Sequence, residues 1–134
     1  MRLAQVQKAI YEALTGSPAL MGMVTGVYDH VDQGTAFPYV VIGEDAASEW
    51  DTDTEVGADS LLTIHIWTEY KGKQQVKDIQ EVIYSILHRA ELTIQDAIFY
   101  GLDWQFSDSF LEPDGETRHG VMRFRLLYDS LPVS

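Results

Sequence analysis

Two stretches of the chain repeat their apolar residues every three or four positions, which is the spacing of one face of an α-helix. The repeating residues are Leu3, Val6, Ile10 and Leu14 within residues 2–15, and Val76, Ile79, Ile83, Ile86 and Leu87 further on. Gly16 and Pro18 end the first pattern, because glycine suits a C-terminal cap and proline cannot continue the helical hydrogen bonds. The sequence therefore predicts one helix over residues 2–15 and another that runs to about Arg89.

Other stretches are rich in β-branched and aromatic residues or alternate between apolar and polar positions, as strands do. They cover residues 27–31, 39–42, 57–70, 97–111 and 117–129. Pro38 precedes the second stretch, so this strand lies at a sheet edge or begins directly after the proline. The run Pro113-Asp114-Gly115-Glu116 predicts a tight turn before the last strand, because proline presets φ and Asp-Gly tolerates positive φ.

The predicted order of elements is α-β-β-β-α-β-β, in a single domain over residues 1–134. Short turns between consecutive strands favour an α+β fold with a mostly antiparallel sheet of four to five strands and two helices packed on one face. The strand residues expected to meet the helices are Leu62, Ile64, Ile66, Met122, Phe124 and Leu126. Together with the two helical stripes they predict one hydrophobic core.

The second face of the sheet has an unusual composition. Strict alternation within residues 97–111 places Ile98, Tyr100, Leu102, Trp104 and Phe106 together on one face. The opposite face of the sheet would then present His65, Trp67, Phe99 and Val121 interleaved with Glu69, Asp103, Arg123 and Arg125. That mixture is too apolar for a purely solvated surface, so we expect loops or another subunit to cover it.

The chain carries 9 Lys and Arg residues against 21 Asp and Glu residues, a formal charge of −12. This charge disfavours a general nucleic-acid binder, which needs clustered Lys and Arg to neutralise phosphates. The absence of cysteine excludes disulfides, Cys-based zinc sites and a thiol nucleophile. No apolar run reaches the roughly 18 residues of a membrane span, and the first residues lack a signal-peptide core. We therefore expect no membrane association and a product that stays in the compartment where it is made.

The residue patterns contain no complete catalytic, cofactor or metal motif. Asp51, Asp53 and Glu55 begin like a calcium-binding loop, but Val56 takes the place of the turn glycine and Leu62 that of the bidentate acid. The four histidines lie on separate elements without zinc spacing, so we expect them at turns or on the surface. No G-x-S-x-G, P-loop or G-x-G-x-x-G sequence occurs. The sequence predicts a protein that is not an enzyme and that binds neither a metal nor a cofactor.

Basic and acidic residues are separated along the chain. The basic residues form two groups: Lys71, Lys73 and Lys77, then Arg118, Arg123 and Arg125. Residues 44–59 hold seven carboxylates, and no Lys or Arg occurs between Lys8 and Lys71. Such separation fits head-to-tail contacts in which the acidic stretch of one copy meets the basic groups of the next.

Within the acidic stretch we expect residues 46–57 to form a mobile loop that orders on assembly. Its only large apolar residues are Trp50 and Val56, whose burial can hardly offset the entropy of ordering the backbone. On assembly Trp50 would anchor in a neighbour's apolar patch, as aromatic residues do at interfaces. The predicted interface residues are Trp50, Asp51, Asp53, Glu55, Trp67, Lys71, Lys73, Arg118, Arg123 and Arg125.

Several runs of residues resemble the tail-completion proteins of long-tailed bacteriophages, also called tail terminators or head-tail joining proteins, which occur in prophages and gene transfer particles as well. The runs are Val27–Val31, Gln33-Gly34, Phe37–Gly43, Asp114–Gly120 and Arg123–Arg125. The resemblance covers nearly the whole chain. It implies a structural protein of the virion, synthesised in the host cytoplasm and placed at the head-proximal end of the tail.

The resemblance also implies partners. Members form a ring, a hexamer, that caps the tail tube protein and joins it to the head-tail connector or stopper protein, while DNA passes through the ring without specific binding. Two other classes remain open from the residues alone. One is a monomeric α+β module that binds a small molecule or a peptide, which would need an apolar pocket with convergent polar groups. The other is a hydrolase using scattered His and Asp residues, for which the sequence offers no positive support.

Overall fold

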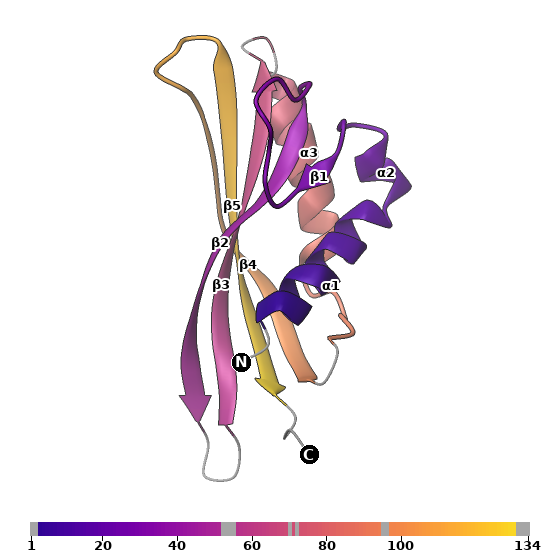
Figure 1. Ribbon diagram of the computed structural model, residues 1–134, viewed down its shortest axis with the longest axis vertical. Coiled ribbons are helices and arrows are strands. Elements are labelled where there is room, and N and C mark those ends of the chain that lie inside the picture. Colours follow the sequence, from indigo (N-terminus) through magenta and orange to yellow (C-terminus); the bar gives the residue numbers. More distant parts are fainter. Residues whose placement is uncertain (1–2, 52–55, 70, 72, 95–96, 131–134) are drawn as a thin grey trace.

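The computed structural model describes residues 3–51, 56–69, 71, 73–94 and 97–130. Its elements are α1 (Leu3–Thr15), α2 (Pro18–Met21), β1 (Val27–Tyr28), β2 (Tyr39–Asp51), β3 (Val56–Glu69), α3 (Lys73–Leu87), β4 (Ala97–Leu111) and β5 (Thr117–Ser130). The five strands form one sheet in the order β1-β2-β3-β5-β4. All three helices lie on the same side of this long, twisted sheet, and the other side is bare (Figure 1). The predicted α+β fold is confirmed.

The pairing of the strands is antiparallel except at one edge. β2 pairs with β3, β3 with β5 and β5 with β4 in antiparallel register, whereas the two residues of β1 run parallel to β2. The strand predicted over residues 27–31 is thus only Val27–Tyr28. β2 begins at Tyr39, directly after Pro38, as the missing N–H of proline favours.

The helix boundaries follow from local chemistry. α1 ends before Gly16, whose N–H donates to the Glu12 carbonyl at 2.9 Å. The sequence did not predict α2, a single turn capped by Ser17, whose Oγ accepts from the Leu20 N–H at 3.3 Å. α3 ends at Leu87, two residues before the predicted limit, because Arg89 adopts a positive φ of 58° and donates its N–H to the Leu102 carbonyl instead.

A single hydrophobic core fills the space between the sheet and the helices. The six strand residues predicted to meet the helices are each at most 2% exposed. Their partners on the helices are Val6, Ile10 and Leu14 of α1, and Val76, Ile79, Ile83 and Leu87 of α3. These seven residues of the two predicted helical stripes are therefore buried against the predicted sheet face, and Ile86 of the second stripe is partly buried beside them.

The alternation predicted for β4 is wrong, because two irregularities interrupt its register with β5. The first lies between Phe99 and Gly101 and the second between Trp104 and Phe106. Each irregularity inserts one extra residue into β4. Because side chains along a strand alternate between the two faces of the sheet, the residues after each insertion lie on the face opposite to the one predicted without it. Phe99 consequently packs against the core, while Phe106 lies opposite Arg123 on the bare side.

In the stretch predicted as a mobile loop, residues 46–57, the structure has strands at residues 46–51 and 56–57, and residues 52–55 lie outside the described residues. Residues 46–51 belong to β2 and pair with residues 56–61 of β3 in an antiparallel hairpin. The hydrogen bonds between paired strands join main-chain groups and depend little on side-chain hydrophobicity. Pairing with β3 therefore orders residues 46–51, although their low apolar content predicted no local burial. A bulge between Ile42 and Asp45 sets the register of this extension.

Candidate functional site

The sheet surface that no helix covers, here called the bare face, carries large apolar residues that remain exposed. Four of these residues are each 39–45% exposed: Leu61 of β3, and Ile98, Phe106 and Phe110 of β4. They share the face with Arg123 and Arg125 of β5, which lie opposite Thr63 and Leu61. This exposed apolar surface makes the bare face the candidate binding surface of the molecule.

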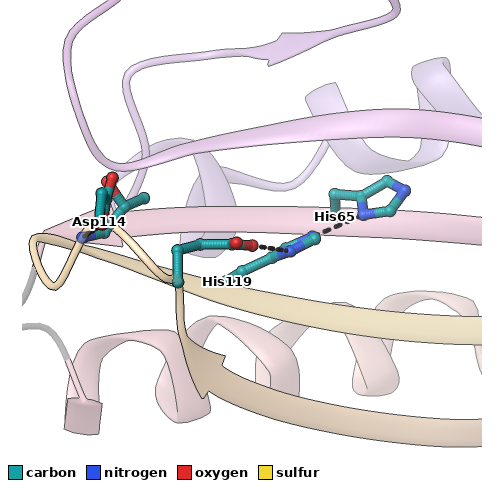
Figure 2. A network of polar contacts seen from close by, with 5 residues as sticks. His65, Asp114 and His119 are labelled. Carbon is teal, nitrogen blue, oxygen red and sulfur yellow. Dashed lines mark hydrogen bonds and ion pairs between the residues drawn. The ribbon is translucent and has the colours of Figure 1, made fainter.

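A chain of short hydrogen bonds crosses the bare face near the β4–β5 turn. His65 Nδ1 lies 2.7 Å from His119 Nε2, and His119 Nδ1 lies 2.7 Å from Glu112 Oε1. Figure 2 shows His119 between His65 and the turn that carries Asp114. When His119 is neutral and donates to the Glu112 carboxylate, its Nε2 accepts from His65, so one proton arrangement satisfies both contacts.

Aromatic rings fix the position of His119. Trp67 stacks on it with ring centroids 3.9 Å apart, and Phe110 meets it edge-on at 5.1 Å. His65 in turn lies against the backbone of Gly43, where an added Cβ would come within 2.6 Å of the imidazole Cδ2. The β2 bulge and this glycine together make room for the histidine pair.

Farther along the bare face, arginines of β5 contact neighbouring strands. Arg125 binds Asp59 of β3 through two nitrogens, with Nη2 2.7 Å from Oδ2. The guanidinium lowers the pKa of the Asp59 carboxyl, and the carboxylate raises the pKa of Arg125. Arg123 lies over the Phe106 ring at 5.4 Å from its centroid, in a cation–π contact.

A shallow cavity of about 390 Å³, here called the aromatic hollow, opens beside the histidine pair. Its lining residues are Phe37, Tyr39, Trp67, Glu112, Pro113, Asp114 and Thr117. Tyr39 and Trp67 are register partners on β2 and β3. Glu112, Pro113 and Asp114 belong to the β4–β5 turn, and Thr117 begins β5. Burial raises the pKa of Tyr39. The turn thus closes one side of a hollow whose other side is aromatic.

The structure brings some of the predicted interface residues together and separates others. Trp67, Arg123 and Arg125 lie on the bare face, while Arg118 pairs with Thr68 on the helix-covered side. Lys71 lines a hollow beside Glu69 and Glu116, and Lys73 begins α3.

The remaining predicted interface residues belong to the acidic stretch. Trp50 and Asp51 lie in β2, in register with Gly57 and Val56 of β3. Asp53 and Glu55 lie outside the described residues. The described end of β2 therefore lies away from the β4–β5 turn (Figure 1).

Sequence reasoning missed the histidine pair. It treated His65 and His119 as separate surface residues, whereas both are half-buried and bonded to each other. The signal was weak: alternation puts both on one face, but only the register of β3 with β5 makes them neighbours. Phe37 and Tyr39 were likewise not identified as part of a site.

The described residues contain no group of three or more His, Asp or Glu side chains placed to hold a metal ion. Within the same residues, no helix is long and apolar enough to cross a membrane.

Comparisons with known proteins agree with one another. The family described as "Tail completion protein gp17" matches residues 8–129. The tail completion protein gp17 of Bacillus phage SPP1 is 26% identical over 120 residues, which cover 90% of this chain and 89% of that protein.

Solved structures resemble the fold. A chain in the virion of a native gene transfer agent particle superposes with a TM-score of 0.89 at 24% identity, covering 96% of this chain and 98% of that one. The structure of the gp17 protein of bacteriophage SPP1 superposes with a TM-score of 0.63 at 25% identity, covering 92% of this chain and 90% of that one.

Proposed function

The chain belongs to the tail completion protein gp17 family, which has a structural role in the virion, and we propose that it acts as a ring subunit. The ring, a hexamer, caps the tail tube at its head-proximal end and joins it to the head-tail connector or stopper protein. DNA passes through its channel. The subunit is made in the host cytoplasm and works without catalysis.

The observation that carries the ring is the bare face. Leu61, Ile98, Phe106 and Phe110 present exposed apolar surface on the side of the sheet that the helices leave open. In a ring each subunit contacts two neighbours through different surfaces, so this face can be covered by the next copy. Burial of the four side chains would then contribute at the roughly 25 cal/mol per Å² that apolar surface provides.

The distribution of charge supports contacts between different ends of neighbouring subunits. Asp51 lies at one end of the β2–β3 hairpin, whereas Lys71 and Lys73 follow the other end of β3. Opposite ends of one long sheet cannot meet within a chain, but they can meet between copies arranged head to tail. Arg125 is different, because it is already bound to Asp59 of its own chain.

The net charge of −12 supports passage of DNA without binding. Carboxylates on a channel wall repel phosphates at short range and keep the genome from adhering. We expect the purified protein to show no tight binding of duplex DNA at about 150 mM salt, where charges are screened beyond roughly 8 Å. Tight binding under this condition, measured by fluorescence anisotropy, would contradict the proposed channel.

Native mass spectrometry and negative-stain electron microscopy test the ring directly. The protein is examined alone and with purified tail tubes of the same phage or particle. We expect six copies per ring, seated at one end of the tube. A monomer in both conditions, with bare tube ends, would contradict the proposal and favour the monomeric binding module.

A matched pair of substitutions tests whether the bare face is the interface. Phe106→Ala removes a side chain that is 42% exposed on that face, and Tyr11→Ala removes one that is 45% exposed on α1. Both should leave the folded monomer nearly as stable as the parent, since surface substitutions usually change stability by about 0.5 kcal/mol or less. Only Phe106→Ala should reduce the fraction of assembled rings.

A further inference from the structure

The aromatic hollow is lined by residues of the β4–β5 turn and of the start of β2. These two segments lie at the end of the sheet opposite the C-terminal end of β2 (Figure 1). Three of its lining residues, Phe37, Tyr39 and Trp67, have aromatic rings. Phe37 and Tyr39 stack with centroids 5.4 Å apart. The Trp67 ring stacks on the His119 ring, with the two centroids 3.9 Å apart. The rings are thus positioned by one another before any ligand binds.

The turn supplies two carboxylates to the opposite wall, Glu112 and Asp114. Asp114 Oδ1 accepts from the backbone N–H groups of Glu116 and Thr117, and its Oδ2 accepts from the Thr117 hydroxyl. These bonds lower the pKa of Asp114, so the group stays ionised. Glu112 Oε1 is bound to His119, which fixes the second carboxylate at the rim.

Aromatic faces and carboxylates have one ligand chemistry in common, because both attract a cation. The described residues that line the hollow include no Lys or Arg to supply one from within. A guanidinium fits this combination better than an ammonium, since its plane stacks on a ring while its edge donates to carboxylates. The volume of about 390 Å³ holds such a side chain with room to spare.

We propose that the aromatic hollow receives an arginine side chain from a neighbouring protein of the virion. That the donor is a virion protein rests on the proposed function, whereas the preference for a guanidinium rests on the lining residues alone. The hollow adjoins the bare face through Trp67 and His119, so a partner that covers the face can reach it. The contact would fix the angle between the two proteins at this end of the subunit.

The test uses the full chain and a small probe, N-acetyl-arginine amide. Its neutral analogue, N-acetyl-citrulline amide, has nearly the same shape without the charge. Binding is followed by NMR through the indole N–H resonance of Trp67, assigned with the Trp67→Phe variant. We expect saturable shifts with the arginine probe and much weaker ones with citrulline. No saturable shift, or equal shifts with both probes, would overturn the proposal.

Two variants test separately the contributions of the aromatic wall and the acidic wall of the hollow to binding. Phe37→Leu keeps apolar bulk but removes a ring, and Glu112→Gln keeps the acceptor for His119 but removes a charge. Each should weaken binding of the arginine probe by about two- to fivefold, the range of an exposed cation–π or charge contact. Tyr11→Leu and Glu91→Gln, which change residues outside the hollow, should bind like the parent.

The same samples distinguish this proposal from the ring. Their oligomeric state is measured in parallel by native mass spectrometry. Arginine binding at the hollow by a protein that forms no ring, either alone or with purified tail tubes, would contradict the proposed function and leave the preference of the hollow for a guanidinium standing. Ring formation by a protein whose hollow does not distinguish arginine from citrulline would overturn only this inference. Backbone NMR spectra that match the parent confirm that each variant is folded.

Discussion

The two faces of the sheet are built from the same strands but follow different rules. On the helix-covered face, Leu62, Ile64, Phe124 and Leu126 are all at most 2% exposed and belong to the hydrophobic core. On the bare face, apolar residues stand beside Arg123, Arg125 and a hydrogen-bonded histidine pair. The difference teaches that the first face holds the core of the fold, while the second leaves large apolar side chains exposed.

The largest effect should come from shortening a core side chain. Ile83→Ala removes a residue of α3 that is 0% exposed, and Ile98→Ala makes the same change at a position on the bare face that is 45% exposed. Urea unfolding should show a loss of roughly 2–5 kcal/mol for Ile83→Ala, because the core retains a cavity. Ile98→Ala should lose less than about 1 kcal/mol. Equal losses would mean that the two faces contribute alike to folding.

A smaller effect should come from the glycine beneath the histidine pair. In Gly43→Ala the new Cβ would lie 2.7 Å from His65 Nε2, so the imidazole must move. We expect a loss of roughly 1–3 kcal/mol, in the range of overpacked sites. Gly101→Ala is the control, since a Cβ there meets nothing within 4 Å. Thermal unfolding of both variants checks the contrast, and an unchanged Gly43→Ala would refute the close packing at His65.

The smallest effect concerns the ion pair of Asp59 with Arg125. Because the folded-state pKa of Asp59 is lowered from 3.8, the stabilisation is fully present above that value and is lost as the pH falls through the lowered pKa. Asp59→Asn should therefore be slightly less stable than the parent at neutral pH, and the two should converge at low pH. Urea unfolding between about pH 2 and pH 7 measures this difference. If the difference in unfolding free energy between Asp59→Asn and the parent stays constant with pH, the ion pair is not its cause.

The comparison also shows how far sequence reasoning reached. It predicted α1, α3 and the helix-facing residues of β3 and β5, since their periodicity is a local property of the chain. It failed for β4, because the irregularities after Phe99 and Trp104 shift the register without a local signal. It failed for residues 46–51 as well, where pairing with β3 took the place of the expected loop.

The candidate site was predicted only in outline. The alternation of side chains along the strands predicted a second sheet face that is not fully solvated. It also placed Trp67, Arg123 and Arg125 on that face, where the structure has them. The bond between His65 and His119 joins residues 54 positions apart, and the aromatic hollow joins Phe37 to a turn more than 70 positions away. Such neighbours depend on strand order and register.

By itself the sequence determined the positions of α1, α3, β3, β4 and β5, the core residues of α1, α3, β3 and β5, and the family to which the chain belongs. These rest on patterns that repeat within a few residues or on matching runs along the chain. The tertiary structure alone decided which face Phe99 and Phe106 occupy, which histidines meet, and where rings and carboxylates form a hollow. The physical reason is that a shift of one residue between paired strands exchanges their faces, and only the folded sheet fixes that shift.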